Sequence, residues 1–408
     1  MPEEAGSPVE RLPDWAASGA VTALVRALDA AGVEHRFVGG CVRDWLAGRP
    51  VRDIDLSSPA APERVMAALE AAGLGAVPTG LAHGTVTAVV EHRPFEITTL
   101  RHDVETDGRR AKVAFVDDWR QDAARRDLTI NALSLAPDRG GGGRLFDYFG
   151  GRADLAAGRV RFVGDPARRI AEDRLRLLRF FRFHAGYGRG APDPEALAAA
   201  RAAAPELAKL SAERLRAELL ALLALPDPRA TLAVMAENAI LAAVLPEATR
   251  LDRVSALIAQ MPKERPDPFL RLTAWLDLVP ESPQGIAERL RLSRAERDRL
   301  GKLAAPEALS DARPLAERLY RDGQATTRDR HLLSTAETGN PPDPAVLAEI
   351  AAWQRPEFPL AGRDLVALGA TPGPTLGRLL SNLEDLWIGA GFAPDRDALL
   401  AEARKRLT

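Results

Sequence analysis

The spacing of apolar residues changes several times in the first third of the chain, and each change predicts a different element. Residues 13–31 repeat their apolar positions with helical spacing, and residues 35–38 form a short apolar run that ends at two glycines. A short apolar run that ends in glycine predicts a strand followed by a turn. Residues 42–46 return to helical spacing, whereas residues 51–56 alternate as a strand does. The pattern therefore predicts strands that alternate with helices.

Three more elements continue this alternation. Residues 63–72 have helical spacing, and residues 85–90 and 95–100 alternate like strands. Alternating strands and helices predict a small α/β domain with a mixed sheet, which we expect to end near residue 137. The glycine run at residues 140–143 predicts a loop after it.

Strand patterns almost disappear after residue 165. Alanine- and leucine-rich segments with helical spacing, separated by prolines, continue to residue 408, and no fixed-period repeat indicates a solenoid. The expected fold class is α+β. We predict a small α/β head at residues 1–137, a helical neck at residues 138–235, and an all-helical body and tail at residues 236–408, with the helical parts elongated.

Composition excludes several classes of protein. The chain has 408 residues, of which 46% are hydrophobic, so it is long enough for two to four domains. Cys41 is the only cysteine, which excludes a disulfide framework and favours a cytoplasmic location. No apolar run reaches the ~18 residues of a membrane helix, and the acidic N-terminus does not resemble a signal peptide. Because the net charge is −2, a nucleic-acid partner would need a local basic patch.

The strand predicted for residues 51–56 carries the strongest candidate for a catalytic site. Asp53 and Asp55 flank Ile54, so on a strand the two carboxylates share one face, ~6.6 Å apart. Like charges at this spacing repel unless a cation lies between them, and two Mg²⁺ ions ~3.5–4 Å apart are the arrangement of two-metal phosphoryl transfer. Glu96, on a neighbouring predicted strand, is the candidate third acidic ligand.

Gly39 and Gly40 lie where a predicted strand runs into a helix. Without Cβ atoms they let backbone N–H groups approach a phosphate closely, so we expect a triphosphate there. Each signal has an ordinary alternative: a glycine pair is often a plain turn, and alternating carboxylates are often a solvated strand face. Their order and spacing together favour nucleotide chemistry.

Five ordered blocks resemble one family. Gly39-Gly40, Arg43 and the Asp53/Asp55 pair are similar to the signature of the nucleotidyltransferase superfamily, in the class II branch that contains bacterial CCA-adding tRNA nucleotidyltransferases and poly(A) polymerases. The other blocks are RRDLTINA at 125–132, DYFGGRADL at 147–155, EDRLRLLR at 172–179 and an LSxERxxxE element at 210–218. Leu128 departs from the usual Phe of the family.

The resemblance implies a template-independent, Mg²⁺-dependent enzyme that adds CCA from CTP and ATP to the 3′ end of tRNA and releases pyrophosphate. Asp53, Asp55 and Glu96 would be catalytic, with the metal on Asp53 and Asp55. The expected nucleotide-binding residues are Gly39, Gly40, Arg43, Arg126, Asp127, Asn131, Asp173, Arg176 and Arg179. Partners would be tRNA, CTP and ATP, with neither DNA nor a membrane; the RNA-binding residues and the oligomeric state stay open.

Asp173 and Arg176 offer a physical basis for choosing the base. Residues 171–183 have helical spacing, which places Asp173, Arg176 and Arg179 on one face. The carboxylate accepts and the guanidinium donates hydrogen bonds, a pattern that cytosine and adenine match and that uracil and guanine do not. Each mismatched buried group costs ~1–3 kcal/mol. The alternative interpretation is an intrahelical Asp173–Arg176 salt bridge, worth ~0.2–0.5 kcal/mol.

Two other segments resemble parts of the same family. The polar segment 102–114 is similar to the flexible loop that assists the change from C to A addition, or it is an ordinary hairpin. Residues 359–380 resemble a C-terminal helix-turn-helix element that cradles tRNA, although their glycines fit close packing equally well.

The rival functions are few. A poly(A) polymerase usually has a longer basic tail, and enzymes that add only CC or only A share the same blocks. A non-catalytic RNA-binding protein would have lost a carboxylate. The doublet His102-Asp103 is the one hint of a metal phosphohydrolase, which would need further ligands.

Overall fold

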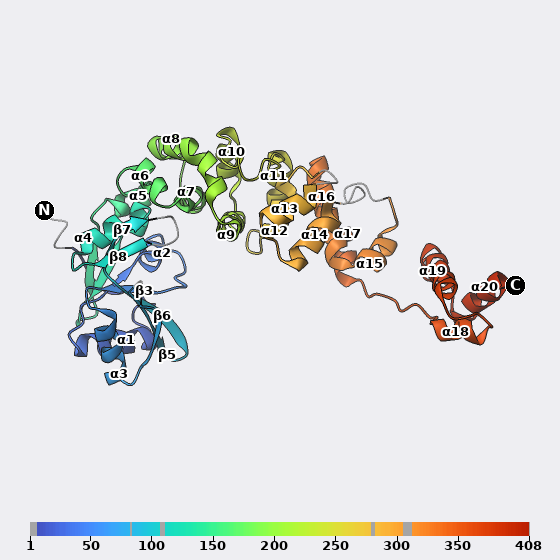
Figure 1. Ribbon diagram of the computed structural model, residues 1–408, viewed down its shortest axis with the longest axis horizontal. Helices are drawn as coiled ribbons and strands as arrows, with labels where there is room; N and C mark the ends of the chain where they lie inside the picture. The colour runs from blue at the N-terminus through green and yellow to red at the C-terminus, as the bar shows by residue number, and fades with distance from the viewer. Residues whose placement is uncertain (1–5, 82–83, 107–110, 279–281, 305–311, 408) are drawn as a thin grey trace. The chain divides into compact units, whose positions relative to one another are not determined.

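The computed structural model of the protein describes residues 6–81, 84–106, 111–278, 282–304 and 312–407. The chain forms two compact units, Met1–Ala248 and Thr249–Thr408, which we describe separately (Figure 1).

A mixed sheet is the centre of the first unit. Within the described residues it has eight strands in the order β1-β10-β9-β2-β3-β6-β5-β4. These strands are β1 (Ser7–Val9), β2 (Arg36–Val38), β3 (Asp55–Ser58), β4 (Gly75–Gly80), β5 (Thr85–Val90), β6 (Arg93–Thr99), β9 (Ser134–Pro137) and β10 (Gly143–Phe146). β3 and β6 are parallel, and the other neighbours are antiparallel. The mixed sheet and the α+β class predicted from the sequence are confirmed.

Helices bury the apolar side of this sheet. They include α1 (Gly19–Ala30), α2 (Gly40–Leu46) and α3 (Pro62–Ala71), whereas Trp119 of α4 (Trp119–Ala124) packs in a separate cluster with Val38 and Leu100. In α1, Val21, Leu24 and Leu28 recur at helical spacing and are fully buried. They share one core with Phe37 of β2 and Ile97 of β6. This packing fixes the strands whose ends carry the candidate catalytic residues.

A separate two-stranded hairpin follows β6. β7 (Arg101–Thr106) pairs antiparallel with β8 (Ala111–Phe115). The polar segment 102–114 of the sequence analysis therefore forms two paired strands, and residues 107–110 lie outside the described residues.

Three element boundaries differ from the prediction. The strand predicted from residue 51 begins only at Asp55, because its neighbour β2 pairs Val38 with Asp55 and then turns into α2. The helix predicted from residue 13 begins at Gly19. The sheet continues to Phe146, beyond residue 137.

Gly143 explains why that last strand was missed. The sequence predicts a loop there, yet Gly143 is the first residue of β10. A Cβ atom at this position would lie 2.5 Å from the carbonyl oxygen of Ala136 on β9, so the strand pairing itself requires glycine.

Helices complete the first unit after the sheet. They include α5 (Gly151–Ala157), α6 (Pro166–Glu172), α7 (Leu175–Tyr187), α8 (Pro194–Ala203), α9 (Ala212–Leu223) and α10 (Arg229–Glu237), with the short 3₁₀ helices η3 (Thr129–Asn131) and η4 (Ala204–Lys209). α7 packs against α9, and its Phe180 ring stacks on Phe162 at 5.6 Å between centroids. Phe162 forms a backbone bridge with Leu128 of the head, so this stacking holds α7 close to the head.

The described part of the second unit is helical. Its helices are α11 (Leu251–Gln260), α12 (Pro268–Trp275), α13 (Ser282–Arg289), α14 (Arg294–Ala304), α15 (Leu315–Asp322), α16 (Gln324–Thr338), α17 (Pro344–Ala352), α18 (Gly362–Ala367), α19 (Pro374–Gly389) and α20 (Arg396–Leu407). Trp387 and Phe392 join Tyr320 in an aromatic core. No helix among the residues described is long and apolar enough to cross a membrane.

Candidate active site

The three candidate carboxylates meet at the ends of two neighbouring strands. β3 and β6 run parallel with Asp55 directly opposite Glu96. Ile54 points into the core with 7% of its surface exposed, so Asp53 and Asp55 lie on the other side. All three carboxylates line one hollow of about 540 Å³, together with Arg52, Thr87, His92 and Arg93. The sequence prediction that Glu96 lies beside the aspartates agrees with this register.

Asp55 lies in an electrostatically unfavourable place. Burial raises the pKa of Asp55 above its ordinary value, and the negative charges of Glu96 and Asp53 raise it further, while Arg126 lowers it. Within the described residues, no arginine or lysine forms an ion pair with any of the three carboxylates. Such a group of unpaired carboxylates is suited to a cation.

A divalent metal fits this donor set only in part. The described residues contain no group of three or more His, Cys, Asp or Glu that would hold a metal by itself. Mg²⁺, however, is commonly bound by one or two carboxylates together with water and substrate phosphates. Asp53 and Asp55 therefore fit a metal that completes its coordination on the nucleotide.

Gly39 lets an arginine approach the start of α2. Its backbone has φ 69°, and a Cβ atom there would lie 2.9 Å from Nη1 of Arg126. Arg126 also donates to the Asn131 carbonyl at 3.4 Å and pairs with Asp122 at 3.3 Å. The N–H of Gly39 itself donates to the carbonyl of Leu133. In any α-helix the N–H groups of the first turn lack an intrahelical acceptor, so in α2 these N–H groups can donate to a phosphate.

A chain of hydrogen bonds joins α2 to α7. Arg43 donates to Oδ1 of Asn131 at 2.6 Å, and Asn131 donates to Oδ1 of Asp127 at 3.0 Å. The other oxygen of Asp127 accepts from Nε of Arg179 at 2.6 Å. The structure thus brings Arg43, Asn131, Asp127 and Arg179 into one network, beside Arg126 and Gly39.

Asp127 is the buried centre of this network. Burial alone would raise the pKa of Asp127, but the charge of Arg179 and the hydrogen bond from Asn131 outweigh it, so its pKa lies below the ordinary value. Asp127 is therefore an ionised acceptor at neutral pH, as recognition of a sugar hydroxyl requires.

Asp173 lies between two helices. α6 ends at Glu172, α7 begins at Leu175, and the backbone of Asp173 is extended, with φ −151° and ψ 108°. The prediction of one helix over residues 171–183 is therefore wrong. Oδ1 of Asp173 accepts from the N–H of Leu175 at 3.1 Å, and such a side-chain acceptor competes with the helical hydrogen bonds.

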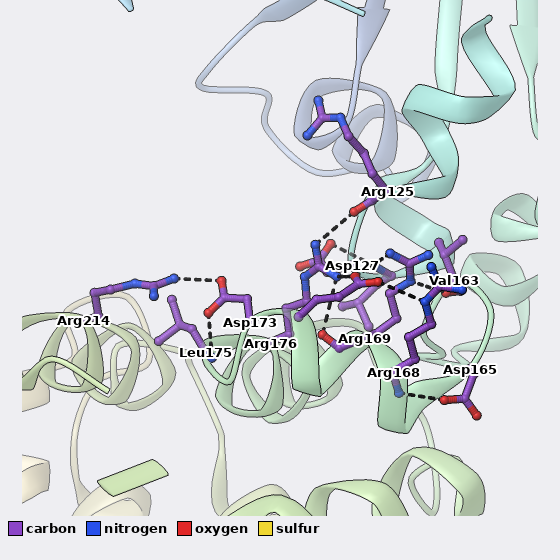
Figure 2. A network of polar contacts seen from close by, with 12 residues as sticks. Arg125, Asp127, Val163, Asp165, Arg168, Arg169, Asp173, Leu175, Arg176 and Arg214 are labelled. Carbon is purple, nitrogen blue, oxygen red and sulfur yellow. Dashed lines mark hydrogen bonds and ion pairs between the residues drawn. The ribbon is translucent and has the colours of Figure 1, made fainter. Parts of the chain in front are cut away.

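Asp173 and Arg176 are held by different partners (Figure 2). Asp173 pairs with Arg214 of α9 at 2.8 Å. Arg176 pairs with Glu172 at 2.7 Å and donates to the backbone carbonyl of Arg125 at 3.0 Å. The structure contains no ion pair between Asp173 and Arg176 among the described residues, so the intrahelical salt bridge considered above does not form.

Sequence reasoning missed the residues that support this arrangement. Glu172 and Arg214 lie inside blocks that resemble the family, but only the fold shows which side chains they hold. Asp154 is fully buried and accepts from the Thr129 hydroxyl at 2.7 Å and from Arg161 at 2.9 Å. Because Thr129 begins η3, Asp154 fixes the segment that carries Asn131.

The Asp127–Arg179 pair predicts a pH-dependent stability. Because the pKa of Asp127 is lower in the folded protein than its ordinary value of 3.8, its ionised form stabilises the fold above that pH, and this stability is lost as the pH falls through the lowered pKa. Asp127→Asn leaves Arg179 unpaired, which is expected to cost about 2–4 kcal/mol at pH 7.

Thermal melts of wild type and Asp127→Asn from pH 7 to pH 3 measure this effect. The difference in Tm is expected to shrink as the pH falls below about 4. Asp14→Asn is the control, since Asp14 is 98% exposed and its pair with Arg11 contributes little. A difference for Asp127→Asn that stays constant with pH would contradict the assignment.

Comparison with known proteins finds relatives along nearly the whole chain. A family model described as "Poly A polymerase head domain" matches residues 35–161, and "Probable RNA and SrmB- binding site of polymerase A" matches residues 191–251. The human mitochondrial CCA tRNA nucleotidyltransferase 1 is 35% identical over 91% of this chain and 87% of its own length. The CCA-adding enzyme of Streptococcus sanguinis is 32% identical over 93% of this chain and 95% of its own.

A solved structure agrees in fold. The Bacillus stearothermophilus CCA-adding enzyme in complex with CTP aligns with a TM-score of 0.78 and 26% identity, covering 95% of this chain and 96% of that one. These similarities agree with the carboxylates at the ends of β3 and β6. The chain belongs to the nucleotidyltransferase family of the CCA-adding enzymes, whose members share the poly(A) polymerase head domain.

Proposed function

We propose that this protein adds CCA to the 3′ end of tRNA, using CTP and ATP and no template. In each step a bond forms between the RNA 3′ oxygen and the α-phosphorus of the nucleotide, and the bond from that phosphorus to the β-phosphate oxygen breaks. Pyrophosphate leaves. The names of the relatives over nine-tenths of the chain support this function over polyadenylation.

The position of Arg126 is the observation that carries the proposal. Its guanidinium lies against Gly39 at the start of α2, and its charge acts on the carboxyl of Asp55. A triphosphate bound to Arg126 and the first turn of α2 would therefore have its phosphates beside the carboxylates of β3 and β6. Arg43, Asp127 and Asn131, which are joined by hydrogen bonds, would orient the sugar and phosphates.

Asp53 and Asp55 would hold Mg²⁺, which when bound promotes loss of the 3′-hydroxyl proton and offsets charge on the phosphates. Glu96, opposite Asp55, is the third acidic residue of the site. The single cysteine of the chain supports a cytoplasmic setting for this reaction.

Asp173 and Arg176 would read the base. Arg214 holds Asp173, the acceptor, and Glu172 holds Arg176, the donor. This supports the role, because the two side chains are held in place without an ion pair to each other. Arg179, one turn after Arg176, ties the same helix to Asp127 and so to the sugar site. We assign chemistry to the head at residues 1–137, base recognition to the neck at 138–235, and tRNA binding to the helices of 236–408.

Sequencing of the reaction products tests the proposal. A tRNA that lacks its 3′ CCA is incubated with the protein and with CTP, ATP, GTP or UTP, singly and as CTP plus ATP. We expect two C residues from CTP alone and CCA from the pair. A product that ends at CC, or that starts only from tRNA ending in CC, would identify an enzyme of narrower range, and long A tracts would identify a poly(A) polymerase.

Gly39→Ala tests the placement of the triphosphate. Gly39 and Gly48 both have a positive φ, 69° and 67°, so alanine strains the backbone at both positions. Only at Gly39 would the new Cβ meet Arg126, whereas nothing lies within 4 Å at Gly48. Loss of one charge-assisted contact of ~1.5–3 kcal/mol predicts a KM for CTP about 10- to 100-fold higher for Gly39→Ala.

Steady-state kinetics at saturating RNA measure this effect, with Gly48→Ala as the matched control. The control is expected to stay within about twofold of wild type. Equal changes in the two variants would show that backbone strain, and not the position of Arg126, sets the affinity.

A further inference from the structure

A second hollow lies at the end of α2. It has a volume of about 540 Å³ and is bounded by the end of α2, by α5 and by the end of α7. Its lining residues are Leu46, Ala47, Arg49, Arg152, Leu155, Ala156, Gly186, Tyr187, Gly188 and Arg189. Three of the ten are arginines and none is acidic. In a chain with a net charge of −2, such a grouping is a local positive site.

Two of these arginines are fixed by the surrounding backbone. Arg49 lies over the ring of Tyr187, 4.1 Å from its centroid, and donates to the carbonyl of Gly186. Arg189 is hydrogen-bonded through its N–H to the carbonyl of Gly158 at 2.8 Å. Gly158 has φ 68°, and a Cβ atom there would lie 2.5 Å from Cγ of Arg189, so the stem of that arginine rests directly on the glycine.

The side chains of two of these arginines lack partners in the described part of the chain. Arg152 and Arg189 are exposed, and the described residues offer neither side chain an ion pair or a hydrogen bond. Elsewhere in the same unit, Arg161 and Arg176 are paired with carboxylates. Guanidinium groups that face a hollow without a carboxylate are suited to an oxyanion, above all a phosphate.

The side chain of Tyr187 links the hollow to the nucleotide network. Tyr187 lines the hollow, and its hydroxyl donates to Oδ1 of Asp44. Arg43, which binds Asn131, lies 4.6 Å from the centroid of the same ring. None of the candidate carboxylates or nucleotide-binding residues lines the hollow, so a phosphate held there belongs to a different part of the substrate than the reacting triphosphate.

We propose that Arg49, Arg152 and Arg189 bind a backbone phosphate of the RNA strand whose 3′ end is being extended. This inference rests on the proposed function, because it places the RNA beside the nucleotide network. Binding of a phosphodiester requires no particular base, which suits an enzyme that acts on one end of many RNAs. The contact helps to hold the RNA while its 3′ end lies at the carboxylates.

Arg152→Gln/Arg189→Gln in the full-length protein tests the proposal. The probe is a tRNA that lacks CCA, and its Kd is measured by fluorescence anisotropy over a series of KCl concentrations. Each lost phosphate contact is expected to reduce the slope of log K against log salt by about 1 and to raise the Kd about three- to tenfold at moderate salt. The Kd for CTP alone, measured by calorimetry, is expected to stay within about twofold.

Arg26→Gln/Arg139→Gln is the matched control. These two exposed arginines line a different hollow of about 560 Å³, which also contains Asp29 and Asp138. That hollow is bounded by α1 and the β9–β10 turn, and α1 lies well apart from α5 in Figure 1. The control also removes two positive charges, but at a different place. If the position of the arginines, and not the total charge, determines RNA binding, the salt slope of the control should match that of wild type.

The outcomes separate this proposal from the proposed function. If the Arg152/Arg189 variant and the control give the same slope and Kd, no RNA phosphate binds in the hollow, even though wild type still adds CCA. If pyrophosphate or CTP, and not tRNA, binds more weakly to the variant, the hollow serves a free phosphate and the proposal fails. A thermal melt shows whether either double variant remains folded.

Discussion

Replacing Asp55 with alanine is expected to abolish nucleotide addition, with a fall of at least about 10³-fold in the rate of a single turnover. Asp55 lies opposite Glu96 on adjacent parallel strands, and no cationic side chain in the described part of the chain is paired with it. Stabilisation of charge at a phosphoryl-transfer site is worth several kcal/mol, and each ~1.4 kcal/mol changes the rate tenfold. Asp53→Ala should have a similar effect.

The fold should survive this change. Burial and the charges of Glu96 and Asp53 raise the pKa of Asp55, so the ionised carboxyl is a cost to the folded protein and not a support. We therefore expect the Tm of metal-free Asp55→Ala at pH 7 to equal or exceed that of wild type. Loss of activity with an unchanged or higher Tm separates a catalytic role from a structural one.

The measurement is incorporation of labelled CTP into tRNA lacking CCA, with enzyme in excess. Glu63→Ala is the control, because Glu63 is an exposed carboxylate of α3 outside the hollow. Glu96→Ala is expected to be severe but to leave measurable activity, since Asp53 and Asp55 remain. Near-wild-type incorporation by Asp53→Ala or Asp55→Ala would overturn the assignment of the site.

The sequence predicts the carboxylate site well because that site depends on local patterns. Alternation alone puts Asp53 and Asp55 on the face opposite Ile54, and the blocks that resemble the family supply the remaining candidates. The parallel pairing of Asp55 with Glu96 depends on the register of two distant segments, which alternation does not determine. The start of β3 at Asp55 likewise depends on where β2 turns away.

The neck was harder to predict for a physical reason. Helical spacing over residues 171–183 is unbroken, so periodicity alone predicts one helix. The break comes from the side chain of Asp173, whose Oδ1 accepts from the N–H of Leu175 and whose other oxygen accepts from Arg214. Arg214 lies 41 residues away, so its contact with Asp173 follows from tertiary packing of α7 against α9.

Asp173→Ala and Arg176→Ala are expected to impair the choice of base far more than the binding of triphosphate. Asp173 provides the acceptor and Arg176 the donor, and each is anchored outside the pair, by Arg214 and by Glu172. A mismatch of buried hydrogen-bonding groups costs ~1–3 kcal/mol, so loss of one reader should reduce discrimination against UTP or GTP about 10- to 100-fold.

Arg168→Ala is the matched control for this test. Arg168 pairs with the same Glu172 at 3.3 Å, but its side chain is 77% exposed, whereas that of Arg176 is 12% exposed. Both changes remove an arginine partner of Glu172, and only Arg176 also donates to the Arg125 carbonyl of the head. Any effect shared by the two variants reports the ion-pair network and not base recognition.

The decisive measurement is kcat/KM for all four nucleotides on one RNA, together with a thermal melt of each variant. We expect the ratio of CTP to UTP to fall for Asp173→Ala and Arg176→Ala and to stay near wild type for Arg168→Ala. A uniform loss for all four bases with a normal melt would indicate that the pair positions the nucleotide without reading it. Unchanged ratios and rates in both variants would overturn the base-reading role, because a residue that contacts the base edge in the transition state must change relative kcat/KM values when it is removed.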